Sequence, residues 1–160
     1  MSRALFMILL ATILAGCHST NPGEPPPPPT GPLQRAQLSD AFLHTYAEEP
    51  IGEPFLEMIR QAHTGVHVIV FMGTWCSDSK REVPRFLRIA DGSGMTAADF
   101  DLYGLDRKKK SPDGLEAKYA IERVPTFIFL REGKEIGRIV ETPRSTLEGD
   151  ILDILARARS

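Results

Sequence analysis

The sequence predicts an α/β fold in which a central, mixed, four-stranded sheet is flanked by helices on both faces. A nearly all-apolar, β-branched run, Val66–Met72, is typical of a strand buried on both faces. Strand-like and helix-like segments alternate after it, which implies parallel pairing across a helical crossover. The last two strand-like runs are joined by the short turn at residues 131–134, so they must pair antiparallel.

Composition is that of an ordinary globular domain. The chain has 160 residues, of which 42% are hydrophobic and 25% charged. Its formal net charge is −2, which does not indicate a nucleic-acid partner.

The first 16 residues have the composition of a secretory signal peptide. Arg3 supplies a positive n-region, and residues 4–16 are uncharged and apolar but shorter than the ~20 residues of a spanning helix. They lead into Leu14–Cys17 (L-A-G-C), which resembles the lipobox of bacterial lipoproteins. In that family the signal peptide is cut before the cysteine, which then carries a diacylglycerol, so the resemblance implies lipidation of Cys17. An ordinary secretory signal with an incidental cysteine is the alternative.

A lipid on Cys17 would anchor the chain to a membrane without spanning it. In enteric-type bacteria, a following residue other than aspartate, here His18, fits sorting to the outer membrane. The expected location is therefore the bacterial cell envelope, on its periplasmic face. Residues 17–37 are predicted to be the lipidated cysteine and a linker, because the run Pro25–Pro29 favours an extended polyproline II spacer. A ligand for a proline-binding domain is the alternative for this run.

The folded domain is predicted to span residues 38–160. Apolar residues at helical spacing, or helix-start signals such as Ser111–Pro112 and the capping box Ser145–Glu148, predict its helices. The helices are expected over Leu38–Ala47, Glu53–His63 and Ser77–Ala90, then from Ser111 and from Ser145. The strands are expected at Val66–Met72, Phe100–Leu105, Thr126–Leu130 and Glu135–Val140.

Motifs in these elements resemble the thioredoxin superfamily. Residues 68–76 (VIVFMGTWC) resemble the strand and loop that enter the thioredoxin active site, with Trp75 directly before Cys76. Pro84 stands where thioredoxins place a kinking proline in the next helix.

The second half of the chain carries the remaining resemblance. Val124-Pro125-Thr126 resembles the V-P-T element whose proline is cis and faces the active cysteine, and residues 131–134 resemble the last hairpin turn. The resemblance covers residues 50–157 and implies a thioredoxin-like fold. It also implies that Trp75 and the V-P-T element contact client proteins.

Several positions depart from the thioredoxin pattern. Ser79 replaces the second cysteine, and Asp78 stands where proline is usual. Val70 replaces the buried aspartate that helps proton transfer, Leu102 falls near its accompanying lysine, and Glu141 falls near a glycine of the peptide-binding rim. The proton-handling parts of a dithiol reductase are therefore largely absent.

Cys76 is nevertheless a candidate nucleophile. It would lie at a helix N-terminus, which favours a thiolate, and we expect the Ser79 hydroxyl to donate a hydrogen bond to it. Lys80 and Arg81 add positive charge nearby, whereas Asp78 either opposes the thiolate or simply complements the helix N-terminus.

The expected function is monothiol–disulfide exchange on extracytoplasmic proteins, with Cys76 as nucleophile. Ser79 cannot resolve a mixed disulfide, and Cys17 would be lipidated, so release requires an external thiol or reductase or a second client cysteine. The expected partners are client proteins with cysteines or disulfides, with no cofactor and no metal. A non-catalytic interaction module is the alternative. A thiol peroxidase fits less well, since Thr74 and Arg81 do not match the spacing of the peroxidase loop.

Two other features have open interpretations. Trp75 is either a client contact or a packing residue at the edge of the core. The basic run Arg107–Lys110 is either a solvated turn or a site for an anionic partner or lipid head groups. The histidines, among them His63 and His67, do not form a metal-binding pattern.

Overall fold

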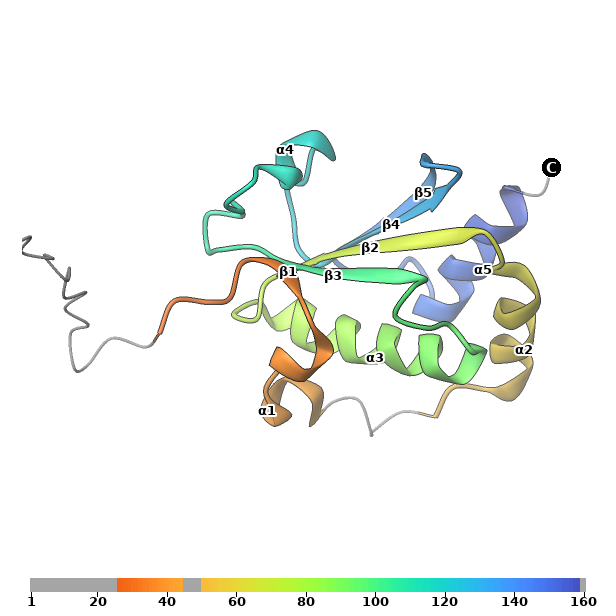
Figure 1. Cartoon of the computed structure of the whole chain (residues 1–160). Helices are drawn as coiled ribbons and strands as arrows, with labels where there is room; N and C mark the ends of the chain where they lie inside the picture. Colours follow the sequence, from red (N-terminus) through yellow and green to blue (C-terminus); the bar gives the residue numbers. More distant parts are fainter. Residues whose placement is uncertain (1–25, 45–49, 159–160) are drawn as a thin grey trace, which may run out of the picture.

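A computed structural model describes residues 26–44 and 50–158 (Figure 1). The strands are β1 (Gly31–Leu33), β2 (Val66–Met72), β3 (Phe100–Gly104), β4 (Thr126–Arg131) and β5 (Lys134–Val140). The helices are η1 (Arg35–Gln37), α1 (Asp40–Leu43), α2 (Glu53–Ala62), α3 (Ser77–Ser93), α4 (Leu115–Lys118) and α5 (Leu147–Arg157). The predicted signal peptide and Cys17 lie outside the described residues. Among the described helices, none has the length and apolar character needed to cross a membrane.

Strand β2 is the centre of a five-stranded sheet with the order β1-β3-β2-β4-β5. It runs parallel to β3 and antiparallel to β4, and β4 and β5 form an antiparallel hairpin, as predicted. Successive side chains of β2 point to opposite faces. Val68 and Val70 therefore join one buried cluster, and Ile69 and Phe71 join another, so β2 is buried on both faces.

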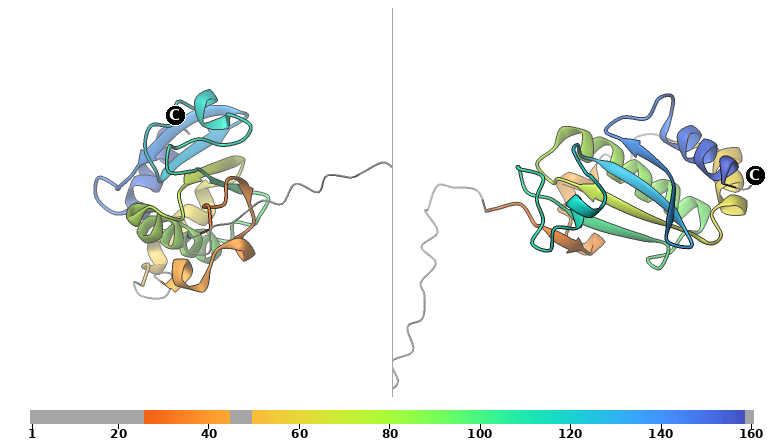
Figure 2. Two further views of the ribbon diagram at one scale, coloured as in Figure 1. Left: turned by 90° about the vertical axis from the view of Figure 1, so that its left-hand side faces the viewer. Right: turned by 90° about the horizontal axis from the view of Figure 1, so that it is seen from above.

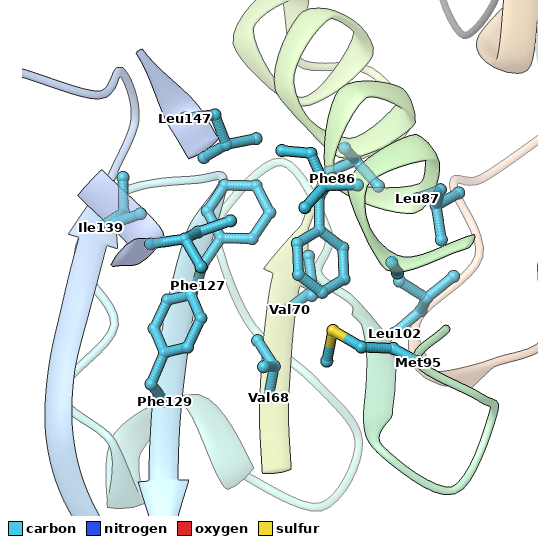
Figure 3. Close-up of a cluster of buried hydrophobic side chains, with 14 of the residues drawn as sticks. Val68, Val70, Phe86, Leu87, Met95, Leu102, Phe127, Phe129, Ile139 and Leu147 are labelled. Atoms are coloured by element: carbon cyan, nitrogen blue, oxygen red, sulfur yellow. The ribbon is translucent and has the colours of Figure 1, made fainter. Parts of the chain in front are cut away.

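The larger core lies between the sheet and helices α1, α2, α3 and α5 (Figure 3). Helix α3 contributes Phe86, whose ring centroid lies 5.4 Å from that of Phe127 and 5.5 Å from that of Phe100. The opposite face is covered by α4 and its flanking loops (Figure 2, right). The described helices thus lie on both faces of the sheet: α1, α2, α3 and α5 pack on the larger core, and α4 packs on the smaller one.

The predicted strand count of four is wrong, because Gly31–Leu33 forms a fifth strand, β1, antiparallel to β3. This segment lies within the predicted linker, and three residues are too short for a recognisable strand pattern. Gly104 permits the approach: a Cβ there would lie 2.4 Å from the Pro29 carbonyl oxygen and 2.9 Å from Leu33 Cδ1. The proline-rich segment therefore reaches the sheet at the end of β3.

Two predicted helix starts also differ. Helix α4 begins after Gly114, whose left-handed backbone (φ 69°) makes it the N-cap, whereas the Ser111 hydroxyl donates to Asp113 and Glu116. Helix α5 is capped by Thr146 rather than Ser145, because the Thr146 side chain accepts the Gly149 N–H. Part of the predicted helix Leu38–Ala47 lies outside the described residues.

We predict that Gly104→Ala lowers the free energy of unfolding by about 1–3 kcal/mol, because the added methyl meets the Pro29 backbone. Denaturant unfolding measures the loss, and hydrogen exchange should show faster exchange in β1. The loss should persist when Leu33→Ala is added, since that change removes only the flexible neighbour. A Gly104→Ala variant as stable as the parent chain would contradict the close packing of Pro29 on β3.

Candidate functional site

Cys76 lies where β2 passes into α3. The loop from Gly73 is closed by a hydrogen bond from the Cys76 N–H to the Gly73 carbonyl (2.9 Å). Cys76 is the N-cap of the 17-residue helix α3, with an extended backbone (φ −86°, ψ 130°). Its side chain is a free thiol, and the residue is half-buried.

The V-P-T element lies against this thiol. The pairing of β4 with β2 sets Thr126 opposite Phe71, which brings the preceding residues to the end of β2. The Val124–Pro125 peptide bond is cis, as the resemblance implies. Cys76 Sγ donates a hydrogen bond to the Val124 carbonyl oxygen at 3.2 Å. The structure therefore brings Cys76, Val124, Pro125 and Thr126 together.

The side chains of Val124, Pro125 and Thr126 are all buried. The Val124 carbonyl already accepts a hydrogen bond from Cys76, and the Pro125 carbonyl accepts one from the Glu141 N–H. The V-P-T element thus packs its side chains inward and presents the Val124 carbonyl to the thiol.

Ser79 has a different partner from the one predicted. Its side chain is fully buried, and its Oγ accepts a hydrogen bond from the Gly73 N–H at 3.2 Å. We expected the hydroxyl to donate to Cys76, but the thiol hydrogen bond in the structure goes to Val124. Ser79 therefore ties the first turn of α3 to the start of the Cys76 loop.

Trp75 is fixed by its own loop. Its ring packs so closely on Gly73 that a Cβ there would lie 2.6 Å from the ring, and its Nε1 donates to the Leu105 carbonyl at 3.0 Å. The ring is half-buried, and the Arg107 guanidinium lies over it, 5.7 Å from the ring centroid. Trp75 thus combines a packing role with a partly exposed surface beside Cys76.

Arg81 forms its ion pairs with carboxylates and not with the Cys76 thiol. It forms ion pairs with Asp78 at 2.9 Å and with Glu82 at 2.7 Å. The hydrogen bond to Glu82, followed by that to Asp78, raises the pKa of Arg81. The predicted contribution of Arg81 to a positive environment at Cys76 is therefore largely cancelled. Lys80, the other cation expected near the thiol, is exposed in the first turn of α3.

Sequence reasoning missed Glu82. This residue is 4% exposed, its Oε1 accepts from Arg81, and its Oε2 has no hydrogen-bond partner among the described residues. The available signal was its position three residues after Ser79, on the same buried side of α3. At the two positions where thioredoxins place their proton-handling pair, by contrast, Val70 and Leu102 are buried in the apolar core.

Sequence reasoning also missed the ion pair of Arg123 with Glu141 (2.7 Å). Glu141 has a left-handed backbone (φ 59°), and its N–H donates to the Pro125 carbonyl at 2.7 Å. A side chain thus stands near the position where thioredoxins have a rim glycine. The hydrogen bond to Glu141 raises the pKa of Arg123. Among the residues described, no group of three His, Cys, Asp or Glu side chains is arranged to hold a metal ion.

Comparisons with known proteins agree with this geometry. A family model described as Thioredoxin matches residues 33–152. The chain is 30% identical over 89 residues to a thioredoxin-like protein of Acanthamoeba polyphaga mimivirus, covering 56% of this chain and 62% of that protein. It is 33% identical over 86 residues to a thioredoxin of Malassezia sympodialis, covering 54% of this chain and 78% of that one. The match thus spans less than two thirds of the length of the mimivirus relative.

Among solved structures, a Pseudomonas aeruginosa protein of unknown function aligns with a TM-score of 0.51 at 20% identity. The alignment covers 74% of this chain and 80% of that one. This likeness shows the shared fold.

We predict that Ser79→Ala lowers the free energy of unfolding by about 1–3 kcal/mol, because the buried Gly73 N–H loses its acceptor. Ser77→Ala is the matched control: Ser77 is exposed in the same helical turn, and its replacement should change stability by less than about 0.5 kcal/mol. Denaturant unfolding compares the two variants. Equal effects of the two changes would show that Ser79 does not hold the loop.

Proposed function

The chain belongs to the thioredoxin family, and on this basis we propose that it is a monothiol protein that exchanges disulfides with extracytoplasmic client proteins through Cys76. The observation that carries the proposal is the placement of one accessible thiol at the N-terminus of α3, 3.2 Å from the carbonyl of Val124 in the V-P-T element. A cysteine without a chemical role would need neither partial exposure to solvent nor a place beside the V-P-T element.

The proposed first step is attack by the Cys76 thiolate on a client disulfide. A bond forms between Cys76 Sγ and one client sulfur, the client S–S bond breaks, and the other client sulfur leaves as a thiolate. The proton lost by Cys76 is available to that leaving thiolate through solvent. The step conserves one disulfide and one thiol, so nothing is oxidised or reduced overall.

The second step needs a thiol from outside the chain. Ser79 lies at the position of a resolving cysteine, but its hydroxyl cannot attack a disulfide. A small thiol, a reductase or a second client cysteine attacks the client sulfur of the mixed disulfide and releases Cys76 as a thiolate. The outcome is disulfide shuffling or transfer to the external thiol.

We place this activity at a membrane surface in the bacterial cell envelope. The support is the L-A-G-C sequence ending at Cys17 behind a short apolar segment. A diacylglycerol on Cys17, followed by the proline-rich segment, would hold the domain near the membrane without a spanning helix.

A non-catalytic interaction module is the second candidate. It is favoured by the apolar Val70 and Leu102 at the proton-handling positions and by the full burial of the V-P-T side chains. Both candidates predict client binding, but only the exchange function requires the sulfur of Cys76.

Trapping in cells tests the exchange function. After rapid alkylation of free thiols, the native chain should form mixed disulfides with clients, seen as bands on non-reducing gels that disappear after reduction. Cys76→Ser should form none. Ser79→Cys should carry fewer, because a second thiol in the same turn of α3 can attack the mixed disulfide. Equal capture of the same clients by the native chain and Cys76→Ser would instead establish the interaction module.

The anchor is tested separately. We expect the mature protein to begin at Cys17 with an acyl mass on that residue, and Cys17→Ser should shift it from the membrane to the soluble fraction. Intact-protein mass spectrometry of the membrane fraction provides the measurement. A mature chain with an unmodified Cys17 would refute the anchor and leave the exchange function untouched.

A further inference from the structure

The basic run Arg107–Lys110 lies next to the exchange site. The connection that follows β3 and the connection from β2 to α3 lie at the same end of the sheet (Figure 1, left). Two contacts join them: Trp75 Nε1 donates to the Leu105 carbonyl, and the Arg107 guanidinium lies over the Trp75 ring. Arg107, the first cation of the run, therefore lies against the residue that directly precedes Cys76.

The run is held as a defined turn rather than a loose loop. Asp106 Oδ1 accepts from the Lys108 and Lys110 N–H groups, both at 2.8 Å, and the Asp106 N–H donates to the Lys110 carbonyl at 3.0 Å. Lys109 has a left-handed backbone (φ 60°), a conformation that costs a lysine more than a glycine or asparagine. The turn thus has a charged side chain, that of Lys109, at a position whose left-handed backbone favours glycine or asparagine.

Three of the four cations of the run have no carboxylate partner among the described residues. Lys110 forms an ion pair with Glu116 at 3.5 Å. Within residues 26–44 and 50–158, Arg107, Lys108 and Lys109 have no ion pair with a carboxylate. Elsewhere around the thiol, Arg81 and Arg123 are both paired with carboxylates. The Trp75 side of the site thus carries several cations that have no carboxylate partner among the described residues.

We propose that the turn Arg107–Lys110 is a selectivity element that recognises a carboxylate carried by the client within a few residues of its reactive cysteine. Exposed charges are screened beyond about 8 Å at physiological salt, so the turn acts only on client groups close to Cys76. Arg107 is suited to this role, since stacking on Trp75 orients a planar guanidinium that can bind a carboxylate through two N–H groups. This inference rests on the exchange function proposed above and adds a substrate class to it.

Matched peptide disulfides test the inference. Three peptides carry glutamate, glutamine or lysine two residues from a single cysteine, which is bound as a disulfide to a neutral aromatic thiol. With the purified protein, the glutamate peptide should form the Cys76 mixed disulfide about three- to tenfold faster than the lysine peptide at low salt. The ratio should approach one in high salt and in the variant Arg107→Gln/Lys108→Gln/Lys109→Gln, and Arg107→Lys should keep part of it. Lys134→Gln, which removes a cation from the turn at the other end of the sheet, should keep the full ratio.

The outcomes separate the two proposals. If Cys76 forms a mixed disulfide with none of the three peptides, the neutral glutamine peptide included, the exchange function fails. If it reacts but the glutamate and lysine peptides have equal rates, the selectivity proposal is overturned and exchange stands. If the triple change lowers sedimentation with phosphatidylglycerol vesicles while the peptide ratio is unchanged, the turn is a membrane contact, which also overturns the proposal. The triple variant should unfold at the same denaturant concentration as the native chain, so that a changed ratio reports the lost charges and not a lost fold.

Discussion

The site depends on the pairing of β4 with β2. This register sets Thr126 opposite Phe71 and thereby brings Val124 and Pro125 to the end of the central strand. The same strand ends in the loop that carries Cys76, so two segments about fifty residues apart in sequence meet at one hydrogen bond between Cys76 Sγ and the Val124 carbonyl. Burial of β2 on both faces fixes this register, because a shift by one residue would exchange the side chains of its two cores.

The surroundings of the thiol divide into fixed and exposed parts. Ser79, Gly73 and the V-P-T element are buried and hold the loop in place. Trp75, Arg107 and Arg123 reach the surface. Glu82 is the exception, since it keeps a buried carboxylate oxygen without a partner among the described residues, close in sequence to the site. Such a group costs stability, and fold requirements alone do not explain its presence.

Sequence patterns predicted most of the sheet, because β2, β4 and β5 carry long apolar or alternating runs and a clear turn. They missed β1, since three residues carry no periodicity, and they misplaced the caps of α4 and α5, where Gly114 and Thr146 act in place of Ser111 and Ser145. The position of Cys76 followed from its motif. The partners of Ser79, Trp75 and Glu141 did not, because those contacts depend on loop geometry that no local pattern encodes.

The central claim is that Cys76 begins an exchange that this chain cannot complete. The most direct test is the lifetime of the mixed disulfide between Cys76 and a model peptide, followed by mass spectrometry of the intact protein. The account predicts an adduct that persists without added thiol and is discharged only when a free thiol is supplied. Return to free Cys76 at the same rate with and without thiol would contradict it.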